Sequence, residues 1–308
     1  MIAQFITVGQ QVFILFTIIL VGLALGKASL MNERVSMGLS NLMMYVVSPC
    51  ALVVAFQRPL EHETFRAFCI AMLASALIQG VSIVVTRLVL HDKDPKRERA
   101  LQFGTIFSNS GFMAYPLQTA LLGTIGMFYG SAFVIPFTII TWTYGIYLIT
   151  GDRKALSVKN LLFNPGMISV IIAMALYLLG VTLPPIFFSP VNYLAQLNTA
   201  VPMLIIGYQL SQSNVKDVLK SGKAWFSAGM RLLVLPALAL LICLAMHIDG
   251  TVLIALTIAA SAPPAAILVM FSEKFGQDAH FASSLVSVQT VFSVLTMPVI
   301  VGIAQYVA

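Results

Sequence analysis

Long apolar stretches follow one another along the whole chain, separated by short polar or Gly/Pro-rich segments. An apolar stretch of about 20 residues is long enough to cross a bilayer as a helix. Taking the polar segments as boundaries predicts ten membrane spans and an all-α integral membrane protein. The spans have the limits 5–26, 35–57, 65–90, 100–121, 128–150, 160–179, 191–211, 224–247, 251–271 and 279–305.

The helix pattern breaks in the middle of the fourth and ninth spans. The two breaks are Ser108-Asn109-Ser110-Gly111 and Ser261-Ala262-Pro263-Pro264. Glycine and proline interrupt helices, and an interrupted backbone at membrane depth survives only where protein or a watery cavity satisfies its polar groups. The breaks therefore predict a cavity near the bilayer midplane, which indicates transport.

The two halves of the chain share one pattern. A shift of 153 residues places the first five spans on the second five and matches Asn109 to Ala262 and Pro49 to Pro202. Because five is odd, the second unit must enter the membrane from the opposite face, as in the inverted repeats of secondary transporters. We expect repeats at residues 1–150 and 160–308, joined by a short cytoplasmic linker at 151–159.

Three prolines inside the spans are candidate helix breaks or hinges, namely Pro49, Pro116 and Pro202. A proline kinks a helix and frees a backbone carbonyl. For Pro49 and Pro202 two interpretations stay open: the carbonyl faces the cavity, or the bend only shapes the scaffold.

Composition and charge support membrane insertion and exclude other classes. Hydrophobic residues make up 59% of the chain and charged residues 9%, which leaves no room for a sizeable soluble domain. The net charge of +6 reflects basic residues scattered over short loops, with no basic face of the kind that binds nucleic acid. Thirteen of the 17 basic residues lie on alternate loops, which predicts that both termini are outside.

The helix ends predict an anion site. After each break a half-helix begins, near Gly111 and near Pro263-Pro264, and its N-terminus carries free N–H groups and a partial positive charge. Asn109 is positioned to donate its amide to a carboxylate, and the serine hydroxyls add hydrogen bonds. In the alternative interpretation these polar residues only cap the broken ends. The predicted substrate site contains Ser108, Asn109, Ser110, Gly111, Ser261, Pro263 and Pro264.

Other polar residues within the spans are candidates for the cavity or the substrate pathway. Gln118 and Gln289 either line the cavity or bond to backbone groups nearby, and Ser48 is a further candidate for the cavity or pathway. Arg231 is the one charge clearly inside a span. Its side chain either snorkels to the inner surface or meets a structural partner, or it contacts the substrate on its inner pathway.

Absent residue types narrow the function further. All eleven acidic residues lie in loops or at span edges, whereas ion-coupled carriers often hold the driving ion with an intramembrane carboxylate. The four histidines also lie at loops, and no catalytic or metal-binding motif occurs within the spans. We therefore expect no enzyme, metal site or cofactor.

Several segments resemble the auxin efflux carrier family. The run from Asn109 to Leu117, followed by Gly123, is similar to the family's fourth-helix motif, and 142–145, 164–165 and 261–265 resemble bacterial members. The resemblance implies a ten-helix fold similar to bile-acid and sodium/proton transporters, a homodimer, and transport of small organic anions such as auxin, malate or malonate. It also implies that the first two helices of each repeat form a scaffold and the last three move, and that Asn109 contacts the substrate carboxylate.

The sequence thus predicts a carrier of mono- or dicarboxylates in the inner membrane of a bacterium. It binds its substrate where the fourth and ninth helices cross and works by alternating access. Two alternatives stay open, a sodium- or proton-coupled symporter of the same fold and a membrane receptor that transports nothing.

Overall fold

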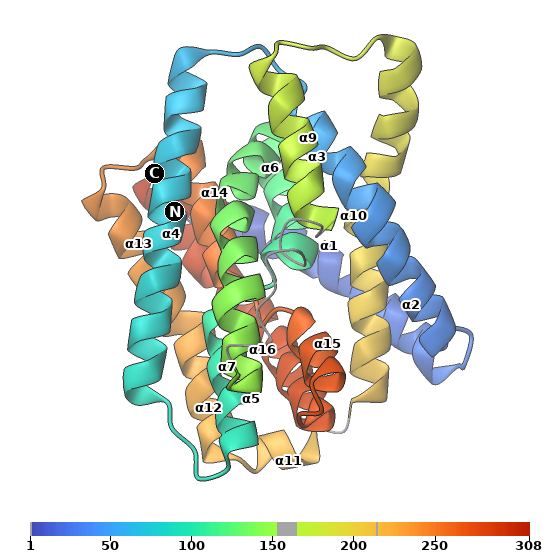
Figure 1. The fold of residues 1–308 in the computed structure, drawn as a ribbon, viewed down its shortest axis with the longest axis vertical. Helices are drawn as coiled ribbons and strands as arrows, with labels where there is room; N and C mark the ends of the chain where they lie inside the picture. Colours follow the sequence, from blue (N-terminus) through green and yellow to red (C-terminus); the bar gives the residue numbers. More distant parts are fainter. Residues whose placement is uncertain (1, 153–164, 214) are drawn as a thin grey trace.

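The chain forms a bundle of helices (Figure 1). This computed structural model describes residues 2–152, 165–213 and 215–308, and every regular element among them is a helix. Six helical stretches in this part of the chain are long and apolar enough to cross a membrane: Ile6–Lys27, Glu33–Phe56, His62–Val89, Ser110–Thr150, Gly222–Ala245 and Ala279–Val307. They confirm a multi-pass, all-helical membrane protein.

The helices of the first half begin and end close to the expected spans. They are α1 (Ile2–Lys27), α2 (Glu33–Leu42), α3 (Ser48–Phe56), α4 (His62–Val89), α5 (Pro95–Ile106), α6 (Tyr115–Ile140) and α7 (Ile146–Thr150). The predicted linker at 151–159 lies outside the described residues, except for its first two positions.

The second half is also built of helices. Its described helices are α9 (Pro165–Leu178), α10 (Pro185–Gln212), α11 (Lys216–Leu219), α12 (Gly222–Gly229), α13 (Leu235–Ala245), α14 (Gly250–Ser261), α15 (Ile267–Lys274) and α16 (Ala279–Val307). The fourth span of the first half and the ninth span overall are each interrupted, between α5 and α6 and between α14 and α15.

Short π-helical turns precede prolines in several spans. The described π turns are η1 (Met43–Val47), η2 (Ser110–Ala114), η3 (Thr141–Gly145) and η5 (Met230–Val234). Pro49, Pro116 and Pro236 each stand two residues after one of these turns. A proline has no N–H to donate, so the turn before it widens to a longer hydrogen-bonding pattern. Pro202, by contrast, lies inside the continuous helix α10.

A glycine with positive φ ends the half-helix that follows each break. Gly123 has φ 69° and Gly276 has φ 64°, a conformation that favours glycine. Gly123 falls inside α6, so the chain turns there although the helix assignment is continuous. The two glycines are 153 residues apart, which equals the shift of the predicted repeat.

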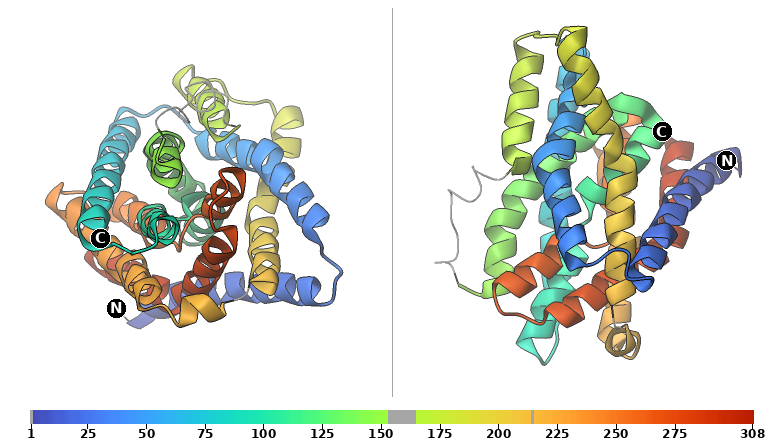
Figure 2. Two further views of the ribbon diagram at one scale, coloured as in Figure 1. Left: turned by 60° about the horizontal axis from the view of Figure 1, so that its bottom comes forward. Right: turned by 90° about the vertical axis from the view of Figure 1, so that its right-hand side faces the viewer.

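The helices pack in two groups. The first contains α1, α3, α9 and α10, and the second is built around α6, α14 and α16 with α4, α5 and α13. In Figure 2 (left) blue α2–α3 and yellow α10 lie on one side, and cyan α4 and the orange helices lie on the other. Within the first group, a Cβ on Gly207 would clash with the backbone carbonyl oxygen of Ile19, so α1 and α10 touch backbone to backbone.

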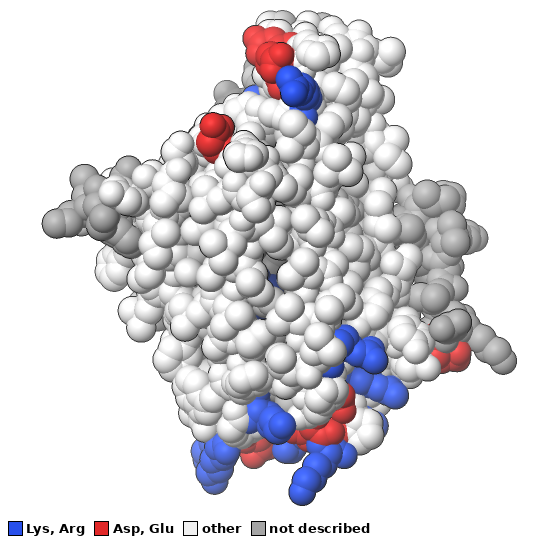
Figure 3. Space-filling view, turned by 90° about the vertical axis from the view of Figure 1, so that its left-hand side faces the viewer, with Lys and Arg blue, Asp and Glu red and all other residues white. Residues whose placement is uncertain are grey.

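Charged side chains concentrate at the two ends of the molecule. Figure 3 shows lysine and arginine gathered at the lower end, a smaller charged group at the upper end, and a broad uncharged band between them. The lower end is where α11 lies in Figure 1. An uncharged band flanked by charged ends is the surface expected of a protein that crosses a bilayer.

Candidate functional site

The two breaks lie against each other and hydrogen-bond directly. Asn109 donates its backbone N–H to the carbonyl of Pro263 at 2.7 Å, and Ala265 donates to the carbonyl of Phe107 at 2.9 Å. Ser108 and Pro264 thereby form an isolated antiparallel β-bridge. These bonds satisfy backbone groups that neither interrupted helix is able to pair. The two breaks form a single buried crossing.

Four helix ends meet at this crossing. Helices α5 and α14 end there, at Ile106 and Ser261, while η2 and α15 begin there, at Ser110 and Ile267. A helix C-terminus carries a partial negative charge and an N-terminus a partial positive charge. The crossing therefore combines two ends of each sign.

The prediction that Pro263 and Pro264 open the second half-helix is wrong. Helix α15 begins three residues later, at Ile267, with Ala266 as its N-cap. Ala262 has an extended conformation with ψ 147°, as expected of a residue that precedes proline. The proline pair is the strand-like segment that pairs with the first break. After the first break the helix begins slightly earlier than expected, with Gly111 already inside η2.

Asn109 joins the two breaks and caps the helix that follows. Its Oδ1 accepts a hydrogen bond from the backbone N–H of Phe112 at 3.2 Å, so it is the N-cap of η2. The side chain is buried, with 7% of the residue exposed. Its amide nitrogen has no hydrogen-bond partner among the described residues. Capping therefore uses the oxygen and leaves the donor free for another acceptor.

The serines beside Asn109 differ from the serine of the second break. Ser108 and Ser110 are buried, and neither hydroxyl has a partner in the described part of the chain. Ser261 is also buried, but its hydroxyl donates to the carbonyl of Ile258 within α14 at 3.0 Å. Of the three serines in the two breaks, only the two in the first break have hydroxyls without a partner among the described residues.

Arg231 does not snorkel, because its side chain is buried beside the crossing and only 3% of the residue is exposed. Its Nη1 donates to the carbonyls of Thr105 at 3.0 Å and Ile106 at 3.1 Å, and its Nη2 donates to the carbonyl of Ala260. These carbonyls belong to the last turns of α5 and α14. Of the alternatives, the structural partner is the one that the structure supports.

The two glutamines and their partners hold neighbouring helices together. Gln118 donates to the carbonyl of Ala255 on α14 at 2.8 Å, which is the backbone bond considered as its alternative role. Gln289 donates to the hydroxyl of Ser227 at 3.1 Å, and that hydroxyl lies 2.7 Å from the hydroxyl of Thr105. The sequence analysis missed Thr105 and Ser227, although both are polar residues within predicted spans.

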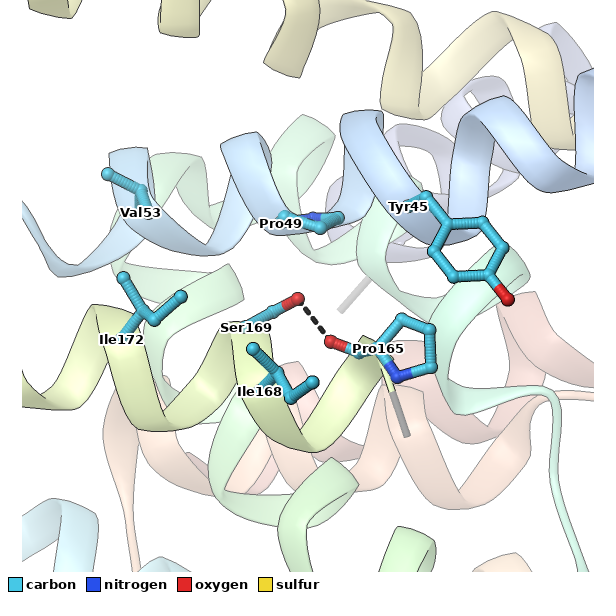
Figure 4. A pocket seen from close by; sticks show the side chains of 7 residues that line it. All are labelled: Tyr45, Pro49, Val53, Pro165, Ile168, Ser169 and Ile172. Carbon is cyan, nitrogen blue, oxygen red and sulfur yellow. Dashed lines mark hydrogen bonds between the residues drawn. The ribbon is translucent and has the colours of Figure 1, made fainter. Parts of the chain in front are cut away.

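A cavity of about 270 Å³ lies between η1, α3 and α9 (Figure 4). Its walls are mostly apolar, and the hydroxyl of Ser169 is bonded to the carbonyl of Pro165. Pro49 lines this cavity, and its neighbour Ser48 is half-buried. Its chemistry does not match an anion site.

A second cavity, of about 210 Å³, lies between α3, α6 and α10 and is more polar. Among its lining residues are Thr119, Thr124, Asn192, Gln196, Asn198 and Thr199. The Oδ1 atom of Asn198 is buried without a partner in the described chain. The cavity lies where the two packing groups meet. Its residues were not predicted, and the run of amides in the seventh span was the available signal.

Comparison with known proteins agrees with this architecture. The sequence matches the family described as membrane transport protein over residues 7–160 and 154–301. It is also 25% identical over 213 residues to an uncharacterized transporter of Methanothermobacter thermautotrophicus, an alignment that covers 67% of this chain and 68% of that protein. Both findings identify a transporter and not an enzyme. The chain belongs to the membrane transport protein family, the auxin efflux carrier family that its fourth-span motif predicted.

Proposed function

We propose that the protein is a secondary transporter of small organic anions, either mono- or dicarboxylates, which bind at the crossing of the fourth and ninth spans. The observation that carries this proposal is the cluster of free donors at the first break. The hydroxyls of Ser108 and Ser110 are buried without partners within the described chain, and no described hydrogen bond uses the amide nitrogen of Asn109. Buried donors without partners are costly, and a carboxylate is an acceptor able to satisfy several of them.

The charges around the crossing support an anion. The N-terminal ends of η2 and α15 each contribute a partial positive charge. No described ion pair joins Arg231 to a carboxylate. Every Asp and Glu of the sequence lies in a loop or at the edge of a predicted span, and none belongs to either break. The negative C-terminal ends of α5 and α14 are bonded to Arg231, so an anion meets the positive ends and no fixed negative charge.

Alternating access requires a membrane topology, which we propose as ten spans in two inverted five-helix repeats with both termini outside. Each repeat has a broken fourth member, followed by a half-helix that ends at a positive-φ glycine. The basic end in Figure 3 then faces the cytoplasm. The two packing groups are the units that move relative to each other, and the polar cavity between them is the substrate's route to the crossing. The proposal includes a homodimer in a bacterial inner membrane.

A ligand screen followed by a flux assay tests this function. Purified protein is mixed with small mono- and dicarboxylates and matched neutral amides, and the thermal unfolding midpoint is measured. A bound substrate raises the midpoint by mass action. The best carboxylate is then labelled and its uptake into proteoliposomes is measured. Saturable uptake supports the proposal, whereas binding without saturable uptake indicates a receptor.

A further inference from the structure

Arg231 occupies the place where the negative ends of both half-helices meet. Its guanidinium donates to carbonyls at the end of α5, those of Thr105 and Ile106, and to the carbonyl of Ala260 at the end of α14. These two helices come from different halves of the chain and have no covalent link near the crossing. One side chain thus binds the C-terminal carbonyls of both broken helices.

The charges of this arrangement balance. Each helix C-terminus carries roughly half a negative elementary charge, so two ends together offer about one negative charge. One guanidinium supplies one positive charge. An arginine buried without a carboxylate partner is otherwise expensive in a membrane protein. The helix ends take the role that an acidic side chain plays in an ion pair.

In transporters with broken helices, half-helix C-termini and unwound carbonyls are the groups that coordinate a coupling cation such as sodium. Here those carbonyls already bond to Arg231. We propose that Arg231 is a built-in replacement for a coupling cation, so that the crossing keeps its geometry and its substrate affinity without sodium. This inference rests on the proposed function, because coupling has meaning only for a transporter.

The chemistry of arginine suits this role. Its planar guanidinium presents donors in a fixed fork, which reaches carbonyls on two helices at once, whereas the single ammonium of lysine does not. Ser227 lies one helical turn before Arg231, and its hydroxyl bonds to Gln289 and lies within hydrogen-bond distance of the hydroxyl of Thr105. The arginine is therefore held by a helix that is itself tied to α5 and α16. A cation fixed in this way cannot leave when the crossing changes its exposure.

Thermal unfolding of the purified, full-length protein tests the inference without a substrate. We measure the midpoint in sodium chloride and in choline chloride at equal ionic strength, and expect no difference for the wild type. Arg231→Ala should lower the midpoint, and free guanidinium at tens of millimolar should raise it again by filling the vacated position. Arg66→Ala is the matched control, since Arg66 is an exposed arginine on α4, and it should not respond to guanidinium.

Two results would overturn the inference. One is a wild-type midpoint that sodium raises and choline does not, because the crossing would then hold a cation of its own. The other is an Arg231→Ala protein as stable as the wild type and indifferent to guanidinium. The wild-type comparison needs no variant, so it decides the matter even where Arg231→Ala does not fold. Arg231→Lys should fall between the wild type and Arg231→Ala.

Uptake of a labelled carboxylate into proteoliposomes separates this inference from the proposed function. We expect saturable uptake of the same rate with sodium and with choline. Uptake that collapses when sodium is replaced overturns the role of Arg231 and leaves the transport function intact. No saturable uptake under either condition overturns the transport function, while the thermal measurements still decide whether Arg231 replaces a bound cation.

Discussion

The two breaks meet at one crossing but are built differently. After the first break the helix restarts at once, because Asn109 caps it and the next residue is already helical. After the second, two prolines continue as an extended segment, and α15 begins at Ile267 without a side-chain cap. The first break carries the free donors, and the second offers a carbonyl to the backbone of Asn109. Under the proposed function, the first break recognises the substrate and the second positions Asn109 through this backbone bond.

Asn109→Ala should have the largest effect. It removes the free amide donor, and a hydrogen bond to a charged group contributes roughly 1.5–3 kcal/mol, so carboxylate affinity should fall about 10- to 150-fold. Titration of the thermal midpoint with the best carboxylate measures this. Asn32→Ala is the matched control, because Asn32 also caps a helix, accepting from Val35 at 3.0 Å, but is exposed and distant in sequence. Equal losses of carboxylate affinity in both variants would show that Asn109 acts only as a helix cap.

Gly123→Ala and Gly276→Ala test whether the two halves are equivalent beyond their breaks. Both glycines have positive φ and open space around the position of a Cβ, so only backbone strain opposes alanine. We expect each substitution to destabilise the protein by roughly 1–3 kcal/mol, with the larger cost at Gly123, whose ψ of −157° lies outside the left-handed helical region. Thermal unfolding checks this. Gly38→Ala, at an uncrowded helical position, should leave stability unchanged or raise it slightly. A large loss of stability for only one of the two variants would contradict the proposed repeat.

Ser110→Ala and Ser261→Ala contrast a free hydroxyl with a bonded one. The Ser110 hydroxyl has no partner in the described chain, so its loss should weaken carboxylate binding by roughly 0.5–1.5 kcal/mol, about 2- to 10-fold. The Ser261 hydroxyl already bonds to Ile258, and its loss should leave affinity unchanged. Binding titrations of the two variants side by side measure the difference. A larger loss of affinity in Ser261→Ala than in Ser110→Ala would show that the second break recognises the carboxylate.

Pro263→Ala should have the smallest effect on the ligand. Alanine keeps the carbonyl that accepts from Asn109 and loses only the rigidity of the ring. The expected cost is about 0.4–1 kcal/mol of stability, through a less restricted unfolded chain, with affinity retained. Thermal unfolding with and without the carboxylate checks both quantities. A variant of normal stability that no longer binds would show that the second break recognises the substrate.

Much of the architecture could be predicted from the sequence, because a helix that crosses a lipid bilayer needs a long apolar stretch, which hydropathy reveals directly. The breaks at 108–111 and 261–264 stand out for the same reason, since glycine and proline are conspicuous in an apolar helix. What could not be predicted is which groups meet across the chain. Arg231 bonds to residues that lie up to 126 positions away, and the bridge between Ser108 and Pro264 joins opposite halves. Hydropathy reports on burial in lipid and carries no information on such partners.

The most direct test of the substrate site is protection of a single cysteine at the crossing. Cys50, Cys69 and Cys243 are replaced, Ser110→Cys is introduced, and modification by a charged thiol reagent is timed with and without the carboxylate. We predict slow modification of Ser110→Cys, because the site is buried and opens only transiently, and strong protection by the carboxylate. The carboxylate should not protect the control variant Asn32→Cys. Equal rates with and without the carboxylate, or no modification in protein that transports it, would contradict a substrate site at the crossing of the broken helices.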